Sequence, residues 1–122
     1  MGNVYVSDRD NNRIQKFTHN GTFIKMWGSK GDKNGQFSIP YSIAIHDLDN
    51  IYVADRENSR IQKFDTNGTF LAKYGSDDKL DGQFHRPEGV TIDSEGSMYV
   101  IDRGNHRIQV FAPMDNAIVN MK

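Results

Sequence analysis

The sequence predicts an all-β fold built from three copies of one antiparallel unit. The stretch 50–64, NIYVADRENSRIQKF, recurs at 3–17 and at 97–111, each time displaced by 47 residues without a gap. Within each copy, short runs rich in β-branched and aromatic residues alternate apolar and polar side chains, as strands do. Asn-Gly pairs at 20–21 and 67–68 favour tight hairpins. Four short antiparallel strands that repeat roughly every 40–50 residues are typical of the blades of a β-propeller.

The expected strands follow the repeat. They lie at 3–7, 14–17 and 22–27 in the first unit, at 42–45, 51–54, 61–64 and 69–74 in the second, and at 90–92, within 97–111 and at 117–121 in the third. Glycine-rich connections ending in proline, GSKGDKNGQFSIP and GSDDKLDGQFHRP, join the units. We expect one domain over 1–122, with blade 1 at about 1–27, lacking its innermost strand, blade 2 at about 41–74 and blade 3 at about 88–122. Helices are not expected.

Composition argues against several classes of function. The formal net charge is -1, so no global bias favours nucleic acid or an anionic membrane as a partner. The chain has no cysteine, which removes thiolate metal sites and disulfides. It has no run of about 18 apolar residues, and its first residues lack the pattern of a secretory signal. We therefore expect no membrane segment, no cofactor and no nucleic acid partner.

Two segments give the repeat a family resemblance. The units YVADRENSRIQKF and GQFxxPxxxxI, with NGTF between copies, closely resemble NHL repeats. The resemblance covers nearly the whole chain, as about two and a half to three repeats of 47 residues. It implies a propeller that usually closes with six blades, so this chain supplies material for just under three.

Every copy carries an acidic residue at the end of one strand and an arginine at the start of the next. Across a hairpin such a pair meets, and a carboxylate-guanidinium contact fixes the loop between them. Because all copies share the pair, we interpret it as structural. The pairs are Asp8 with Arg13, Asp55 with Arg60 and Asp102 with Arg107.

Ligand contacts are expected where the copies diverge, since a ligand rarely shares a propeller's symmetry. Each copy of the repeat has a loop between its two strands. In an antiparallel meander, these loops lie on the same face of the propeller as the two glycine-rich connections. A ligand on this loop-rich face would meet the repeated loop arginines, which either pack the loop or contact the ligand. It would also meet residues of the loops and connections that differ from one copy to the next. The candidate ligand-binding residues are Arg9, Tyr41, Arg56, Glu57, Ser59, His85, Arg86, Glu88, Arg103 and His106.

Three functions fit this face, and we favour a non-enzymatic scaffold that binds a protein or peptide. Some NHL propellers bind single-stranded RNA on such a face, but here acidic residues flank the arginines and only Tyr41 is aromatic near a connection. DRENSRIQ and GQFSIP also look like segments of the peptidyl-hydroxyglycine lyase of peptide amidation. The resemblance implies zinc-binding histidines directly after each proline, where this chain has Tyr41 and Glu88. The four histidines, His19, His46, His85 and His106, show no ligand spacing.

A blade buries both faces of its sheet, so the outer flanks of blades 1 and 3 need partners. On blade 2, the side chains of Ile51, Val53, Ile61 and Phe64 are expected to be covered. We expect either head-to-tail self-association, two chains approximating six blades, or the remainder of a longer propeller. Asn20 and Asn67 fit the glycosylation pattern, and hairpin chemistry explains both without a sugar.

Overall fold

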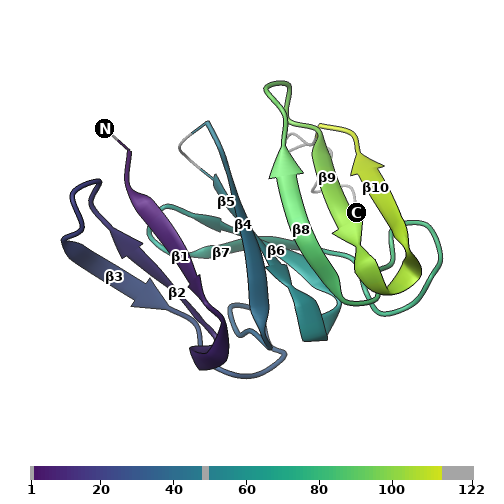
Figure 1. Cartoon of the computed structure of the whole chain (residues 1–122), viewed down its shortest axis with the longest axis horizontal. Helices are drawn as coiled ribbons and strands as arrows, with labels where there is room; N and C mark the ends of the chain where they lie inside the picture. The colour runs from purple at the N-terminus through teal and green to yellow at the C-terminus, as the bar shows by residue number, and fades with distance from the viewer. Residues whose placement is uncertain (1, 48–49, 114–122) are drawn as a thin grey trace.

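Antiparallel sheets follow one another along the chain like the blades of a fan in the computed structural model, which describes residues 2–47 and 50–113 (Figure 1). Blade 1 contains β1 (Val4–Asp8), β2 (Arg13–Phe17) and β3 (Phe23–Trp27). Blade 2 contains β4 (Pro40–His46), β5 (Asn50–Asp55), β6 (Arg60–Asp65) and β7 (Phe70–Tyr74). Blade 3 contains β8 (Pro87–Ile92), β9 (Met98–Asp102) and β10 (Arg107–Phe111).

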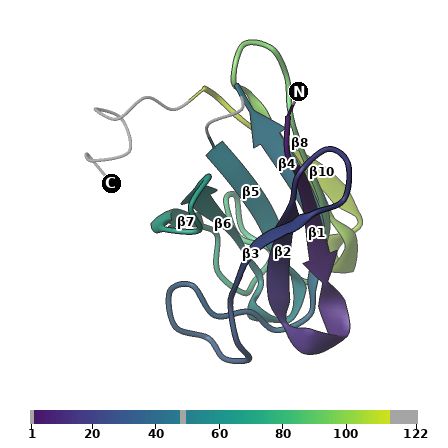
Figure 2. The same ribbon diagram turned by 90° about the vertical axis from the view of Figure 1, so that its left-hand side faces the viewer.

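Neighbouring strands in the sequence pair in every sheet, in the orders β1-β2-β3, β4-β5-β6-β7 and β8-β9-β10. The all-β class and the partial propeller are therefore confirmed, as is the missing innermost strand of blade 1. The strand expected at 117–121 lies outside the described residues. Figure 2, in which blade 1 faces the viewer, shows β1 as an edge strand beside the neighbouring β4.

Short helical turns replace the loops that the sequence left without structure. Single 3₁₀ turns, η1 (Arg9–Asn11), η2 (Arg56–Asn58) and η3 (Arg103–Asn105), connect the antiparallel strands of each pair. The expectation of no helices was wrong at these points. A turn of three residues is too short to show helical periodicity in a sequence. Each turn ends at a residue with a left-handed backbone, and these residues are Asn12, Ser59 and His106.

The pairing register is the same in each blade after a shift of 47 residues. Val6 pairs with Gln15 in blade 1, Val53 with Gln62 in blade 2, and Val100 with Gln109 in blade 3. A slip of one residue would turn every apolar side chain to the opposite face of the sheet, so the alternating pattern fixes this register.

The core lies between blades and includes a phenylalanine from each connection. Phe37 is fully buried with Ile14 of blade 1 and with Ile51, Val53 and Phe64 of blade 2. Its ring centroid lies 5.6 Å from that of Phe64. The second core cluster repeats this arrangement between blades 2 and 3, with Ala54, Ile61, Phe84, Val90, Met98 and Val100. The apolar side chains expected to be covered on blade 2 are indeed fully buried.

A hairpin glycine adds a close contact between blades 1 and 2. Gly68 follows Asn67 in the β6–β7 hairpin and lies against the Trp27 indole, where a methyl group would come within 2.6 Å of Trp27 Cδ2. Nearby, Lys16 Nζ donates a hydrogen bond to the Thr66 carbonyl at 2.7 Å. The hairpin of one blade thus closes over the neighbouring blade.

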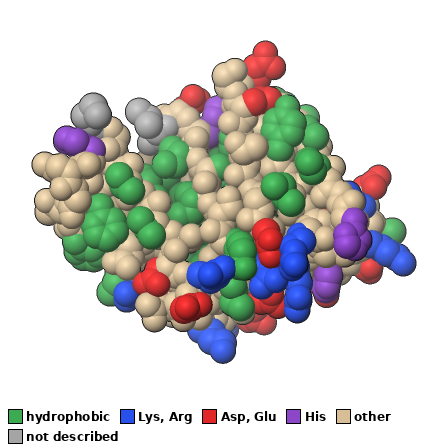
Figure 3. Space-filling view, in the orientation of Figure 1, with side chains coloured by type: hydrophobic (Ala, Val, Ile, Leu, Met, Phe, Trp, Pro, Cys, Tyr) green, Lys and Arg blue, Asp and Glu red, His purple; other side chains and the backbone are tan. Residues whose placement is uncertain are grey.

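The outer flanks of the fan are open. Val4 is 46% and Val6 42% exposed on blade 1, whereas their counterparts on blade 2 are fully buried. On blade 3 the exposed side chains include Ile101, Ile108 and Val110. Hydrophobic side chains are visible on both sides of the molecule in the space-filling view (Figure 3). Among the described residues, no helix is long and apolar enough to cross a membrane.

Candidate binding face

The 3₁₀ turns and the connections between blades meet at one end of the fan. Glu57 N donates to the Ser38 carbonyl at 3.0 Å, and Gly104 N donates to the His85 carbonyl at 2.7 Å. Each connection therefore runs directly beside the turn of the blade that it enters. Charged side chains gather at this end, along the lower edge of Figure 3.

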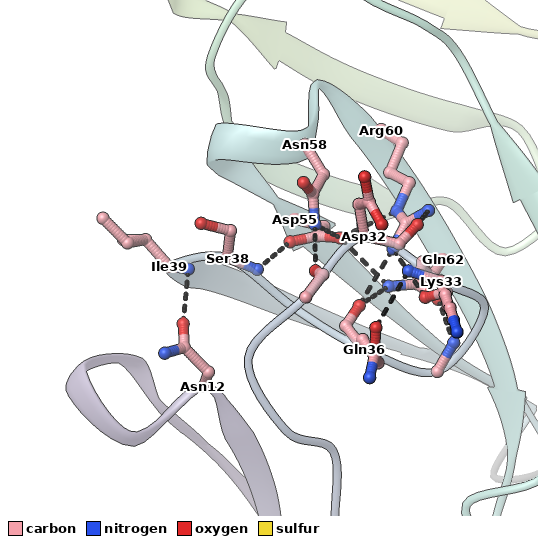
Figure 4. Close-up of polar contacts among 12 residues, drawn as sticks. Asn12, Asp32, Lys33, Gln36, Ser38, Ile39, Asp55, Asn58, Arg60 and Gln62 are labelled. Carbon is pink, nitrogen blue, oxygen red and sulfur yellow. Dashed lines mark hydrogen bonds and ion pairs between the residues drawn. The ribbon is translucent and has the colours of Figure 1, made fainter.

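A quartet of polar side chains fixes the connection to blade 2 (Figure 4). Its centre is the carboxylate of Asp55, which is fully buried at the end of β5. Asp55 Oδ2 accepts hydrogen bonds from Asn58, Arg60 and Gln62 at 2.9, 2.8 and 3.0 Å. Asp55 Oδ1 accepts the backbone N–H of Ser38 at 2.8 Å.

The donors of this quartet continue to the backbone of the connection. The Arg60 guanidinium donates to the carbonyls of Asp32, Lys33 and Gln36 at 2.9–3.0 Å. Gln62 Nε2 donates to the same Gln36 carbonyl at 2.7 Å, and its Oε1 accepts from Gly35 N at 2.9 Å. Among the described residues, the Asp32 and Gln36 carbonyls accept no backbone hydrogen bond, so the quartet satisfies two carbonyls that would otherwise be unpaired.

Blade 3 repeats the quartet with Asp102, Asn105, Arg107 and Gln109. Asp102 Oδ1 accepts from His85 N at 2.8 Å, and Arg107 Nη2 donates to the Leu80 and Gln83 carbonyls at 2.8 and 2.9 Å. Burial raises the pKa of Asp55 above its usual value. In the more open blade 3, burial acts in the same direction, but the donors outweigh it and the pKa of Asp102 falls below its usual value.

The sequence pattern predicted only the acidic residue and the arginine of each quartet. The charge pairs lie where we expected them, with Nε–Oδ2 distances of 2.8 Å in all three blades. The asparagines and glutamines were missed, although they recur in every copy, as Asn11, Asn58 and Asn105 and as Gln15, Gln62 and Gln109. Repetition was the available signal. It marks them, like the charge pairs, as part of the blade.

The diverging residues form a second, more exposed group around Tyr41. The guanidinium carbons of Arg9 and Arg56 lie 4.6 and 4.9 Å from the centroid of the Tyr41 ring. Both distances are within the range of cation–π contacts. The turns of blades 1 and 2 thus place their arginines against the first strand of blade 2.

Acidic side chains continue this group toward blade 3. Arg56 Nε lies 2.9 Å from Glu88 Oε2, and Arg56 Nη1 lies 3.2 Å from Glu57 Oε2. The first contact is an ion pair without a hydrogen bond, because the buried Arg56 Nε donates to no acceptor among the described residues. Two more arginines share the same carboxylates at longer range: Arg86 with Glu57 at 3.6 Å and Arg103 with Glu88 at 3.5 Å.

We call this group the arginine cluster: Arg9, Tyr41, Arg56, Glu57, Arg86, Glu88 and Arg103. Three of its guanidinium groups, those of Arg56, Arg86 and Arg103, share two carboxylates, and the fourth, that of Arg9, lies over the Tyr41 ring. The side chains of Arg86 and Arg103 are 49% and 58% exposed, whereas Arg56 is largely covered. The cluster is therefore a locally cationic surface on a chain with almost no net charge.

Sequence comparison assigns the chain to a family. The profile of the NHL repeat matches residues 1–17, 37–64 and 84–111, which together make up more than half of the chain. The chain belongs to the NHL-repeat family. No curated protein matches its sequence. The NHL assignment agrees with the blade geometry, because each matched segment in blades 2 and 3 begins at the buried phenylalanine of a connection.

Solved structures resemble the NHL chain in fold at low sequence identity. A structural genomics protein of unknown function from Bacteroides thetaiotaomicron aligns with a TM-score of 0.71 and 16% identity, over 90% of this chain and 32% of that one. An auxiliary nutrient binding protein from the same organism gives 0.68 and 18%, over 89% and 34%. Virginiamycin B lyase from Staphylococcus aureus gives 0.62 and 17%, over 95% and 40%. This chain thus spans a third to two fifths of their length.

The remaining candidates on the NHL blades lie apart from the arginine cluster. Ser59 is only 5% exposed, so it lies beneath the face, and its Oγ is 3.4 Å from Asp77 Oδ1. His85 Nδ1 contacts the same Asp77 oxygen at 3.0 Å. His106 is exposed at the end of η3. Gly104 takes the place of an acidic residue because a methyl group there would come within 2.3 Å of His85.

The positions after the two prolines belong to the arginine cluster. Tyr41 contacts two arginines, and Glu88 forms ion pairs with two. Across residues 2–47 and 50–113, no group of three His, Cys, Asp or Glu side chains is arranged to hold a metal ion.

Proposed function

We propose that this NHL chain is a non-enzymatic scaffold that binds a protein or peptide through its loop-rich face. The observation that supports this most directly is the arginine cluster, in which three guanidinium groups share two carboxylates and a fourth, that of Arg9, lies over the Tyr41 ring. None of its arginines is part of a quartet, so the cluster is not needed to hold a connection. Its chemistry suits a partner that presents carboxylates to Arg9, Arg86 and Arg103.

The cluster is also partly pre-organised for binding. Contacts with Tyr41 and with Glu57 already restrict the Arg9 and Arg56 side chains, which lowers the entropy lost when a ligand orders them. A planar guanidinium accepts a carboxylate through two parallel hydrogen bonds, and Tyr41 adds an aromatic surface of the kind enriched at binding hot spots.

A peptide library tests this proposal. We expect a random peptide library to yield binders enriched in Asp and Glu. Their affinity should fall about a hundredfold or more in the variant Arg86→Ala/Arg103→Ala, because each of the two lost charge-assisted contacts contributes about 1.5 kcal/mol or more. The matched control is Lys25→Ala/Lys73→Ala, which removes two exposed cationic side chains from the outer strands β3 and β7 and should leave binding unchanged.

Two results would contradict the proposal. One is the absence of any selected peptide whose binding depends on Arg86 and Arg103. The other is tight, salt-sensitive binding of a random RNA pool that the same double variant abolishes, which would favour the RNA-binding alternative. Stoichiometric zinc together with lyase activity in purified protein would support the amidating-lyase alternative instead.

Self-association is a second proposal, supported by the open flanks. The exposed Val4 and Val6 of blade 1 and Ile101 and Ile108 of blade 3 are counterparts of Ile51, Val53, Ala54 and Ile61, which pack in the core between blades. Two chains joined head-to-tail would approximate a ring of six blades. Light scattering should therefore report a dimer, and a stable monomer at micromolar concentration without any partner would count against it.

A further inference from the structure

Blade 1 contains the same quartet as the other blades, but none of the described residues forms a connection that fills it. Asp8 Oδ2 accepts from Asn11, Arg13 and Gln15 at 3.0, 2.8 and 3.1 Å. These hydrogen bonds, led by the one from Asn11, lower the pKa of Asp8. The geometry within the quartet is thus that of blades 2 and 3.

What differs is the outer side of the quartet. The Arg13 guanidinium reaches only Met26 Sδ, at 3.4 Å, besides Asp8. In the described part of the chain, neither Arg13 nor Gln15 donates its side-chain hydrogen bonds to a backbone carbonyl. Their counterparts Arg60 and Gln62 both bind the Gln36 carbonyl. In blades 2 and 3, the arginine and glutamine of the quartet bind the backbone of a connection. In blade 1, the same two side chains are available to bind the backbone of another segment.

The apolar surface beside the quartet shows a matching gap. Phe64 and Phe111 each pack against the phenylalanine of a connection, with ring centroids 5.6 and 5.8 Å apart. Their counterpart in blade 1, Phe17, contacts only Phe23 of its own hairpin among the aromatic rings. Together with the exposed Val4 and Val6, this leaves the site of one buried phenylalanine vacant.

A hollow marks the place of the missing strand. It has a volume of about 470 Å³, lies along β1 and is lined by Val6, Ser7, Asp8, Arg9, Asp10, Gln15 and Tyr41. β1 pairs with β2 on one side only, so the backbone groups of its other edge face this hollow. Free backbone groups on a sheet edge bind extended peptides by strand addition.

We infer that blade 1 is an acceptor site for an extended peptide of the pattern Gly-Gln-Phe-x-x-Pro followed by alternating apolar residues. The pattern is that of residues 35–45 and 82–92, which fill the equivalent sites of blades 2 and 3. This site borders the arginine cluster, which contributes Arg9 and Tyr41 to the hollow, but Arg86 and Arg103 do not line it.

The filled blades give the register of the added strand. Pro40 pairs with Asp55, Ile43 with Val53 and Ile45 with Ile51. Shifted by 47 residues, the proline of the peptide lies opposite Asp8, the third residue after it opposite Val6, and the fifth opposite Val4. The carbonyl before the phenylalanine then accepts from Arg13 and Gln15, and the phenylalanine ring covers Phe17.

A peptide of the chain's own sequence tests this inference. A labelled peptide with residues 34–46, NGQFSIPYSIAIH, should bind the chain with 1:1 stoichiometry in fluorescence anisotropy. Replacing its phenylalanine by alanine should weaken binding by about tenfold or more, because the ring is the buried anchor.

Matched variants of the chain locate the site. Gln15→Ala removes a donor of the vacant quartet and should weaken binding, whereas Gln109→Ala, in the filled quartet of blade 3, should not. The double variant Arg86→Ala/Arg103→Ala should also bind the peptide normally, which separates this site from the arginine cluster. Absence of saturable binding, or equal effects of Gln15→Ala and Gln109→Ala, would overturn the inference.

Discussion

Removal of one buried carboxylate measures how much the quartet contributes to the fold. In the variant Asp55→Ala, Asn58, Arg60 and Gln62 lose their common acceptor, and Ser38 N loses its partner. Asp55 is fully buried and the Arg60 side chain is 7% exposed, so the cation remains away from water without its counter-ion. Breaking such a pair from one side costs about 3–5 kcal/mol. The whole domain has only about 5–15 kcal/mol of stability, so the loss should be severe.

The chain contains its own control for this experiment. Asp8→Ala removes the same residue type with the same kinds of side-chain partners, but in a half-buried quartet that holds no connection among the described residues. Its free energy of unfolding should therefore fall much less. Urea denaturation followed by circular dichroism measures both variants, provided that the slope of the transition stays unchanged. Equal losses in the two variants, or a loss below about 1 kcal/mol for Asp55→Ala, would refute the structural role of the quartet.

Three further predictions concern packing and pH. Gly68→Ala should lower the free energy of unfolding by about 1–3 kcal/mol more than Gly21→Ala, because both glycines have positive φ but only the methyl group at 68 meets Trp27. Thermal unfolding of both variants measures the difference. Similar losses of stability in the two variants would contradict the contact. Phe84→Ala, at a fully buried ring, should cost about 3–5 kcal/mol by urea denaturation, and a loss below about 1 kcal/mol would show that the connection does not anchor blade 3. Burial raises the pKa of Tyr74 to about 12. The unfolded phenol ionises first, near its usual pKa of about 10, so stability falls as the pH rises between these values. Tyr74→Phe should reduce that fall in denaturation at high pH, and an unchanged fall would contradict the assignment.

The repeat made most of the fold predictable from sequence. Apolar alternation and the Asn-Gly hairpins placed the strands and their order, since both act within a few residues of chain. The 3₁₀ turns were not predicted, because a single turn leaves no periodic trace. The number of strands in each copy predicted that blade 1 is incomplete. The structure adds that blade 1 has hydrogen-bond donors and an apolar site for one phenylalanine at the place of the missing segment.

The candidate site was predictable residue by residue but not as an arrangement. Tyr41, Arg9 and Arg56 were each singled out, yet their contact depends on how two blades are placed side by side. Ser59 was expected on the face and is buried, with its Oγ 3.4 Å from Asp77 Oδ1 of the next connection, and this contact depends on how the connection folds over blade 2. The full quartets were missed because their targets are backbone carbonyls, which every residue has and no sequence pattern marks.

Amide hydrogen exchange of β1 tests the central claim most directly, namely that blade 1 is a complete acceptor that lacks only its strand. Without peptide, the β1 amides that face the hollow should exchange faster than those of β5 and β9, which pair on both sides. Addition of the 34–46 peptide at saturation should slow the β1 amides by about tenfold or more and leave β5 and β9 unchanged. Unchanged exchange in β1 while the peptide is bound would contradict this account of blade 1.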